Sequence, residues 1–273
     1  IARMLEDPFF DPNWHFHPEY QLFVVLEGTG TRFVGDSIQR FQSGDLIFTG
    51  PNLPHLWRSD QEYYEQREGL VTRGVVIYFH EDFLGRALLE KNELFVIRQL
   101  LEKARKGMKI TAGTARKVKN LMLELLQLEG FTSILQLLNI LNVLANASDY
   151  HLLSSDSYCN TLKRSDTDRM NKVYDFIMAN FSRKISLEEV AALAFMTPSS
   201  FSRYFRSHTN KTFSQFLSEI RIGHASKLII EKEMNVAEAG FKSGFNTLSN
   251  FNRQFRAVHR RSPSEYRRAY LGM

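Results

Sequence analysis

Cysteine is almost missing from this sequence: Cys159 is the only one among its 273 residues. A single thiol forms no internal disulfide and supplies no cysteine-rich zinc scaffold, so a disulfide-bonded domain and a cysteine-rich zinc domain are both excluded. A chain without disulfides suits a reducing compartment, and we expect a cytoplasmic protein. Cys159 lies in a polar stretch with no basic cluster beside it, which predicts an inert thiol.

Long apolar runs are missing as well. The densest apolar stretch, 134–147, is shorter than the about 20 residues of a membrane-spanning helix, and polar residues interrupt it. We therefore expect no membrane partner. Hydrophobic residues make up 43% of the chain and charged residues 24%, which is typical of a globular protein, and the length favours two folded units.

Three common catalytic motifs are not found. The sequence contains no Gly-x-Ser-x-Gly nucleophile elbow, no glycine-rich phosphate-binding loop and no His-Glu-x-x-His zinc motif. We expect no catalytic residue, no cofactor and no enzyme activity, apart from one alternative that depends on a histidine cluster described below.

The first 80 residues consist of short β-rich runs separated by glycine-containing turns. Many short strands at such spacing predict a small all-β barrel or sandwich over 1–80. The predicted strands lie at 21–26, 31–34, 38–41, 46–49 and 75–79.

From about residue 81 the apolar residues recur at helical spacing, and we predict a helical support and dimerisation region over 81–150. The helix expected at 131–145 is apolar around most of its girth, so either core packing or a dimer seam explains it. Residues 151–167 are rich in Ser, Asp and Thr and lack a period, which predicts a linker.

Charge is distributed unevenly. Residues 161–273 contain 19 Lys and Arg against 10 Asp and Glu, a net charge of +9, whereas residues 1–160 carry −4. A basic C-terminal part fused to a mildly acidic N-terminal part suggests a module that binds a polyanion.

The basic part contains an internal repeat at an offset of 50 residues. FSRYFR at 201–206 overlays FNRQFR at 251–256, and the same shift pairs Phe195 with Phe245 and Glu188 with Glu238. Each copy shows a capped short helix, a tight turn and a second helix, which is the helix-turn-helix pattern. A long helix at about 212–230 joins the copies and would span about 28 Å.

The second helix of each copy is amphipathic. Its inward face is predicted to carry Phe201, Tyr204, Phe205 and His208 in copy one, and Leu248, Phe251, Phe255 and Val258 in copy two. The opposite faces present small polar side chains and arginines without a carboxylate. Such a stripe suits the major groove of DNA, where arginine bonds guanine edges. The stripe residues are Ser199, Ser202, Arg203 and Arg206, and Ser249, Asn252, Arg253 and Arg256.

At these residues, over about 169–268, the chain resembles the DNA-binding domain of the AraC family of bacterial transcription activators. The most specific stretch is AGFKSGFNTLSNFNRQF at 239–255. The resemblance implies a C-terminal all-α domain over 168–270 that binds double-stranded DNA. It implies base contacts by Ser199, Ser202, Arg203, Leu248, Ser249, Asn252 and Arg253, and we assign phosphate contacts to Arg206, Lys211, Arg256 and Arg261. One departure is Arg260, where that family usually has glycine; we expect it to cost about 1 kcal/mol.

The β region resembles the cupin-like sensor barrel of the same family. The matching segments are HFHPE at 15–19, Gly28-x-Gly30, Gly44-Asp45 and PNLPHLW at 51–57. The resemblance implies a small-molecule effector, often a sugar, inside the barrel. The residues assigned to it are His15, His17, Glu19, Tyr20, Arg32, His55 and Trp57.

The histidine cluster leaves an alternative open. Three histidines from neighbouring strands are typical ligands of iron, manganese or zinc, so a metal-dependent cupin enzyme is the second hypothesis. Glu19 follows His17 more closely than the usual cupin spacing, and we expect effector contact or hydrogen bonding rather than a metal. A third hypothesis is a constitutive DNA-binding protein whose barrel only dimerises.

The preferred interpretation is a multidomain, ligand-responsive transcription activator. It has an N-terminal all-β cupin-like barrel with following helices and a C-terminal all-α domain of two helix-turn-helix units. We expect double-stranded DNA, a small-molecule effector, RNA polymerase and a second copy of the chain as its partners.

Overall fold

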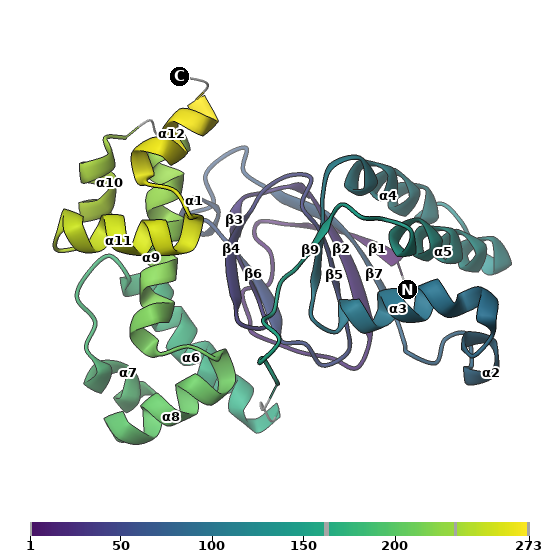
Figure 1. The fold of residues 1–273 in the computed structure, drawn as a ribbon, viewed down its shortest axis with the longest axis horizontal. Helices are drawn as coiled ribbons and strands as arrows, with labels where there is room; N and C mark the ends of the chain where they lie inside the picture. Colours follow the sequence, from purple (N-terminus) through teal and green to yellow (C-terminus); the bar gives the residue numbers. More distant parts are fainter. Residues whose placement is uncertain (1, 161–163, 232–233, 272–273) are drawn as a thin grey trace. The chain divides into compact units, whose positions relative to one another are not determined.

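The computed structural model describes residues 2–160, 164–231 and 234–271. The chain divides into two compact units, Ile1–Asn160 (unit 1) and Thr161–Met273 (unit 2). Figure 1 shows unit 1 as strands with flanking helices and unit 2 as helices. This composition confirms the predicted fold class.

Unit 1 contains two antiparallel sheets. One has six strands in the order β1-β7-β2-β5-β8-β9, and the other has three in the order β4-β3-β6 (Figure 1). The strands are β1 Ala2–Asp7, β2 Tyr20–Glu27, β3 Gly30–Val34, β4 Ser37–Phe41, β5 Leu46–Thr49, β6 His55–Ser59, β7 Thr72–Phe79, β8 Met108–Ile110 and β9 Tyr150–Leu152.

The central strands β7, β2 and β5 of the six-stranded sheet are buried on both faces. Along β2, Leu22 and Val24 belong to the core beneath the helices, whereas Phe23 and Val25 belong to the barrel interior. Successive side chains of a strand point to opposite faces, so a strand covered on both sides must be apolar throughout. This explains why residues 22–26 form a continuous apolar run rather than an alternating one.

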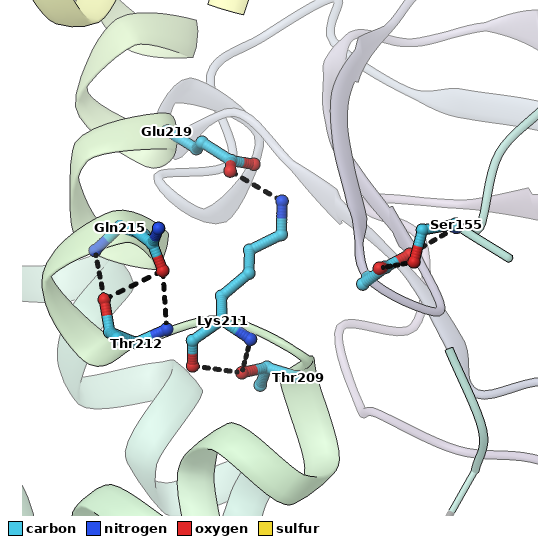
Figure 2. Close-up of polar contacts among 7 residues, drawn as sticks. Ser155, Thr209, Lys211, Thr212, Gln215 and Glu219 are labelled. Carbon is cyan, nitrogen blue, oxygen red and sulfur yellow. Dashed lines mark hydrogen bonds and ion pairs between the residues drawn. The ribbon is translucent and has the colours of Figure 1, made fainter. Parts of the chain in front are cut away.

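Strands β8 and β9 lie in segments for which the sequence predicted helix and linker. β9 pairs with β8, and residues beyond it continue to bond unit 1: the amide of Leu153 donates to Gly107 at 2.9 Å, and that of Ser155 to Asp36 at 2.9 Å. Ser155 appears in Figure 2. The polar composition of 151–160 therefore reflects a surface segment held by backbone hydrogen bonds, and not a free linker.

Helices α3, α4 and α5 of unit 1 cover one face of the larger sheet (Figure 1). The longest, α5, divides its apolar residues between two environments. Ile140, Leu141 and Leu144 are buried in the core, whereas Phe131 is 70% and Leu135 48% exposed. The elements are α1 Gln61–Tyr64, α2 Arg86–Leu89, the 3-10 turn Asn92–Leu94, α3 Phe95–Ala104, α4 Ala112–Leu125 and α5 Gly130–Ala145.

Unit 2 consists of two helix-turn-helix modules around one long central helix, α9 (Figure 1). At 19 residues, α9 is about 28 Å long. The helices are α6 Arg164–Asn180, α7 Leu187–Leu193, α8 Pro198–Thr209, α9 Phe213–Glu231, α10 Val236–Lys242, α11 Leu248–His259 and α12 Pro263–Leu271.

Side-chain caps fix where these helices begin. Ser186 and Glu189 form the predicted capping box on α7, and Thr197 and Thr247 cap α8 and α11. Thr212 and Gln215 exchange similar bonds at the start of α9, where the amide of Thr212 donates to Gln215 Oε1 at 2.9 Å (Figure 2). Each cap satisfies amides that the first turn leaves without an intrahelical partner.

The register of the repeat differs from the prediction in its first half. The amide of Met196 donates to Ala191, as that of Phe245 donates to Gly240, so these residues correspond at an offset of 49. The predicted pairs Phe195 with Phe245 and Glu188 with Glu238 are therefore wrong. Phe195 is 86% exposed whereas Phe245 is 3% exposed. Asn246, an extra residue in the second turn, restores the offset of 50 from α8 and α11 onwards.

Helices α8 and α11, the second helix of each module, both end at a residue whose backbone is in the left-handed region. Asn210 after α8 has φ 56°, and Arg260 after α11 has φ 58°. Each donates its amide at 2.9 Å to the carbonyl four residues earlier, which closes the helix. Asparagine tolerates this region, whereas a β-carbon on arginine is strained there.

Replacing Arg260 by glycine should stabilise unit 2 by about 1 kcal/mol, because glycine adopts positive φ without the β-carbon clash. Urea unfolding followed by far-UV circular dichroism measures this. Arg260→Ala is the matched control: it removes the same charge but keeps the β-carbon, and should gain nothing. Equal stabilisation by both variants would show that charge, and not backbone strain, is responsible.

Candidate nucleic-acid interface and sensor groove

Helices α8 and α11 are each oriented by a pair of buried phenylalanines. Phe201 and Phe205 on α8, and Phe251 and Phe255 on α11, have no exposed surface. Because residues three and four apart share a helix face, burying these rings turns the opposite face to solvent. The residues predicted to contact bases are all exposed: Ser199, Ser202, Arg203, Leu248, Ser249, Asn252 and Arg253.

Two residues predicted to lie inward in copy two do not. Val258 is 42% and Leu248 38% exposed. In copy one the position matching Val258 is His208, which is buried beside Tyr204. In copy two the next residue, His259, turns inward, with its Nε2 2.9 Å from Ser226 Oγ, and Val258 lies at the surface.

The four predicted phosphate contacts differ in availability. Arg206, Arg256 and Arg261 are exposed. Lys211 is half-buried, and its Nζ lies 2.6 Å from Glu219 Oε1 (Figure 2). An ammonium already paired with a carboxylate attracts phosphate less than an exposed arginine does, so the structure favours the three arginines.

In unit 1 the structure brings His15, His17 and His55 together. One ring nitrogen from each lies within 4.8 Å of the others. His15 and His55 bond each other's backbone across two strands, and each Nδ1 lies 2.7 Å from a carbonyl oxygen, of Asn13 and of Leu53. These Nδ1 atoms must therefore donate, which leaves the Nε2 lone pairs to accept a bond or bind a cation.

Burial keeps His17 and His55 neutral. It lowers the pKa of His55 well below its usual value, with a further lowering from the two neighbouring imidazoles. Burial is also the main cause that lowers the pKa of His17, against a smaller opposing effect of Glu19, whose Oε2 lies 3.3 Å from His17 Nδ1. Neutral imidazoles are able to accept hydrogen bonds or ligate a metal.

The sequence analysis missed Gln21, which lies at the centre of the cluster. Its side chain is buried, and one polar atom of its amide lies 3.1 Å from Nε2 of both His17 and His55. Because the neutral His55 ring has its lone pair on Nε2, the amide NH2 group is the one that faces it and donates. The position that faces these two imidazoles thus holds a neutral amide, whereas Glu19 lies off to one side. An amide is a weaker ligand than a carboxylate for iron, manganese or zinc. The donor set therefore fits a metal only in part.

The remaining predicted effector residues are scattered. Trp57 is buried beside His55, at 5.5 Å between ring centroids. Tyr20 is on the other face of the sheet, where its ring stacks on Phe79 at 5.2 Å. Arg32 is buried in an ion pair with Asp45, with NH1 2.8 Å from Oδ2. Tyr20 and Arg32 therefore take structural positions outside the histidine cluster.

His15, His17 and Glu19 are among the residues that line a groove of about 1020 Å³, which we call the sensor groove. Apolar residues of α4, α5 and the loop between them also line it. A groove with both polar and apolar lining suits a small molecule with both kinds of surface. The apolar lining includes Phe83, Leu125, Leu128, Ile134 and Leu137, which the sequence analysis did not assign to a site.

Two family models match the chain: one described as "Cupin domain" over residues 7–62 and one as "Helix-turn-helix domain" over 190–269. The HTH-type transcriptional activator RhaS of Enterobacter sp. (strain 638) is 22% identical over 93% of this chain and 86% of its own length. This chain carries an N-terminal cupin domain and a C-terminal helix-turn-helix domain of the AraC type, and its relatives are HTH-type transcriptional regulators. The predicted family resemblance is thereby confirmed.

Two further relatives each match about a third of the chain. The HTH-type regulator YdeC of Bacillus subtilis (strain 168) is 30% identical over 37% of this chain, which spans 34% of YdeC. The solved C-terminal domain of AraT from Geobacillus stearothermophilus is 26% identical over 37% of this chain and 84% of that domain, with a TM-score of 0.35. No helix among the described residues is long and apolar enough to cross a membrane.

The buried His259 of the regulator predicts a pH-dependent stability of unit 2. Burial lowers its pKa to about 4 from 6.5, so the unfolded chain takes up the proton at a higher pH than the folded one does. The stability that neutral His259 contributes is complete above pH 6.5 and decreases as the pH falls towards 4. His259→Gln should therefore lose less stability than the wild type between pH 7.5 and pH 5.

Urea unfolding at the two pH values, followed by far-UV circular dichroism, tests this. Both tryptophans, Trp14 and Trp57, belong to unit 1, so their fluorescence follows that unit separately and serves as the control. Parallel pH profiles for wild type and variant would contradict the role of His259.

Proposed function

We propose that this regulator binds double-stranded DNA sequence-specifically, with α8 and α11 in successive major grooves. The observation that carries the proposal is the pair of exposed Ser/Asn/Arg stripes, each opposite two fully buried phenylalanines. The net charge of +9 on residues 161–273 supports attraction to a polyanion. Major grooves on one face of DNA are roughly 34 Å apart, a distance comparable to the length of α9.

The contacts divide into two kinds. Arg203 and Arg253 would read guanine edges, with the neighbouring serines and Asn252 close to the bases. Arg206, Arg256 and Arg261 would bind phosphates, which fixes register without reading sequence. Leu248, exposed at the start of α11, would contact a thymine methyl group.

Unit 1 would sense a small molecule in the sensor groove. The imidazoles of His15 and His17 would offer hydrogen-bonding nitrogens, and the apolar residues of α4 and α5 would cover a less polar portion. A sugar or another small metabolite with hydroxyl groups on one side and an apolar face on the other fits this description. The exposed end of α5, with Phe131 and Leu135, would form the homodimer seam, because such an apolar stripe favours association.

Activation is the proposed direction of control, since RhaS, which this chain matches over most of its length, is named an activator. RNA polymerase would then be a further partner. Such a protein works where the chromosome is, in the cytoplasm. The histidine cluster favours a second candidate, a metal-dependent cupin enzyme, in which His15, His17 and His55 would hold the ion and polarise a bound substrate.

Arg253→Ala should weaken binding to a cognate duplex, selected from a random library, by about 1–3 kcal/mol, because it removes a bidentate base contact. Binding to unrelated duplexes should hardly change. Arg256→Ala is the matched control three residues further along α11: it should weaken both kinds of duplex alike and reduce the salt dependence by about one phosphate contact. Gel-shift titrations measure both. Unchanged affinity and site preference in Arg253→Ala would reject the base contact.

Gln21→Glu should create a metal site that the wild type does not have. A carboxylate facing His17 and His55 completes a three-histidine, one-carboxylate set, so the variant should take up one Co²⁺ per chain and unfold at a higher temperature with it. The double variant Gln21→Glu, His17→Gln should lose this binding. Metal analysis after dialysis gives the stoichiometry. Stoichiometric Co²⁺ in the wild type, lost in His17→Gln, would instead favour the cupin enzyme.

A further inference from the structure

The two helix-turn-helix modules meet at one polar junction, which is centred on Arg221 of α9. Arg221 donates from Nε to the carbonyl of Phe181 and from NH2 to that of Arg183, both at 2.7 Å. These carbonyls belong to the turn between α6 and α7, in the first module. One guanidinium thus fixes α9 to the first module by two bonds in a planar fork.

The same guanidinium also contacts the second module. Its carbon lies 5.9 Å from the ring centroid of Phe245, in the turn before α11. Gly244, beside it, approaches so closely that a β-carbon there would lie 2.7 Å from the carbonyl oxygen of Phe181 and 2.9 Å from Arg221 Nε. The turns of both modules therefore touch each other and Arg221 at this point.

Apolar packing does not fill this junction. A hollow of about 260 Å³ lies there, with Arg221, Gly244 and Asn246 in its lining. One further link crosses it: His224 Nδ1 lies 3.0 Å from Ser243 Oγ, and the His224 ring contacts Phe181 at 4.9 Å between centroids. Both modules also pack on α9 through apolar side chains. At the junction itself the directional polar contacts restrict the angle between the modules further, because such contacts tolerate less displacement than apolar ones.

We propose that Arg221 is a positioning residue that sets the separation between α8 and α11, and thereby the spacing between the two DNA half-sites that the protein accepts. The proposal rests on the DNA-binding function proposed above. Two linked binding elements gain affinity only when their geometry fits both sites at once. A rigid junction therefore makes the protein selective for the spacing between the two half-sites. Arg221 itself touches no base in this proposal.

Arg221→Lys tests this with the charge retained, because an ammonium cannot reproduce the two-pronged bond. Affinity is measured by gel shift on a series of duplexes in which the two half-sites are moved apart or together by one base pair at a time. The wild type should show a sharp optimum. The variant should lose about tenfold at that optimum, show a flat spacing profile and keep its affinity for an isolated half-site.

Lys184→Gln is the matched control, since it removes a neighbouring exposed cation but leaves the carbonyls of Phe181 and Arg183 that Arg221 uses and the side-chain bonds of Arg183 that hold this turn. It should keep the wild-type optimum. Gly244→Ala, which inserts a β-carbon into the junction from the second module, should flatten the spacing profile as Arg221→Lys does. Circular dichroism confirms that each variant is folded.

The outcomes separate the two levels of the proposal. A sharp optimum retained in Arg221→Lys overturns the positioning role while the DNA-binding function stands. Equal losses on isolated and paired half-sites also overturn it, since they indicate general destabilisation. If the wild type binds paired half-sites no more tightly than it binds an isolated half-site, the proposed function itself is refuted, because α8 and α11 would then not act together.

Discussion

The burial of two phenylalanines on each of α8 and α11 is the constraint on which the rest of unit 2 depends. Phe201 and Phe205, and Phe251 and Phe255, are fully enclosed, and their positions leave each helix only one rotation about its axis. The polar stripes face outward as a consequence. The same burial ties both helices to α9, so the orientation of the DNA-facing surface and the stability of the fold have a common origin.

Local sequence signals were enough to predict most of the helices of unit 2. The caps Ser186, Thr197 and Thr247 and the helical spacing of aromatics located the helices of both modules, because these effects act within a few residues. The register of the repeat needed more than that. Two phenylalanines aligned by a constant offset are chemically identical, yet Phe195 is exposed and Phe245 buried, and only the contacts of the folded chain distinguish an inserted Asn246.

Unit 1 shows where sequence reasoning reaches its limit. The histidine cluster was identified from the spacing of His15 and His17, which lie two residues apart, although this segment forms only an isolated bridge to His55. Gln21 at its centre was not identified, since a glutamine in an apolar strand carries no chemical signal by itself. Tyr20 and Arg32 were assigned to the effector although they lie elsewhere. Their neighbours alternate between two buried faces, so no difference in polarity marks which face a side chain takes. β9 escaped detection for a related reason, as its stability comes from backbone bonds to β8.

The two modules distribute backbone strain differently. Copy one has Phe195 in the left-handed turn before α8 and Asn210 after it, whereas copy two has Gly244 in the turn and Arg260 at the end. Each copy thus has one residue suited to positive φ and one that is not. In copy two the glycine lies where the chain must approach Phe181 and Arg221, a contact that a β-carbon would obstruct. Copy one has no such approach to make and accommodates a phenylalanine, so the position of the glycine follows from the junction between the modules.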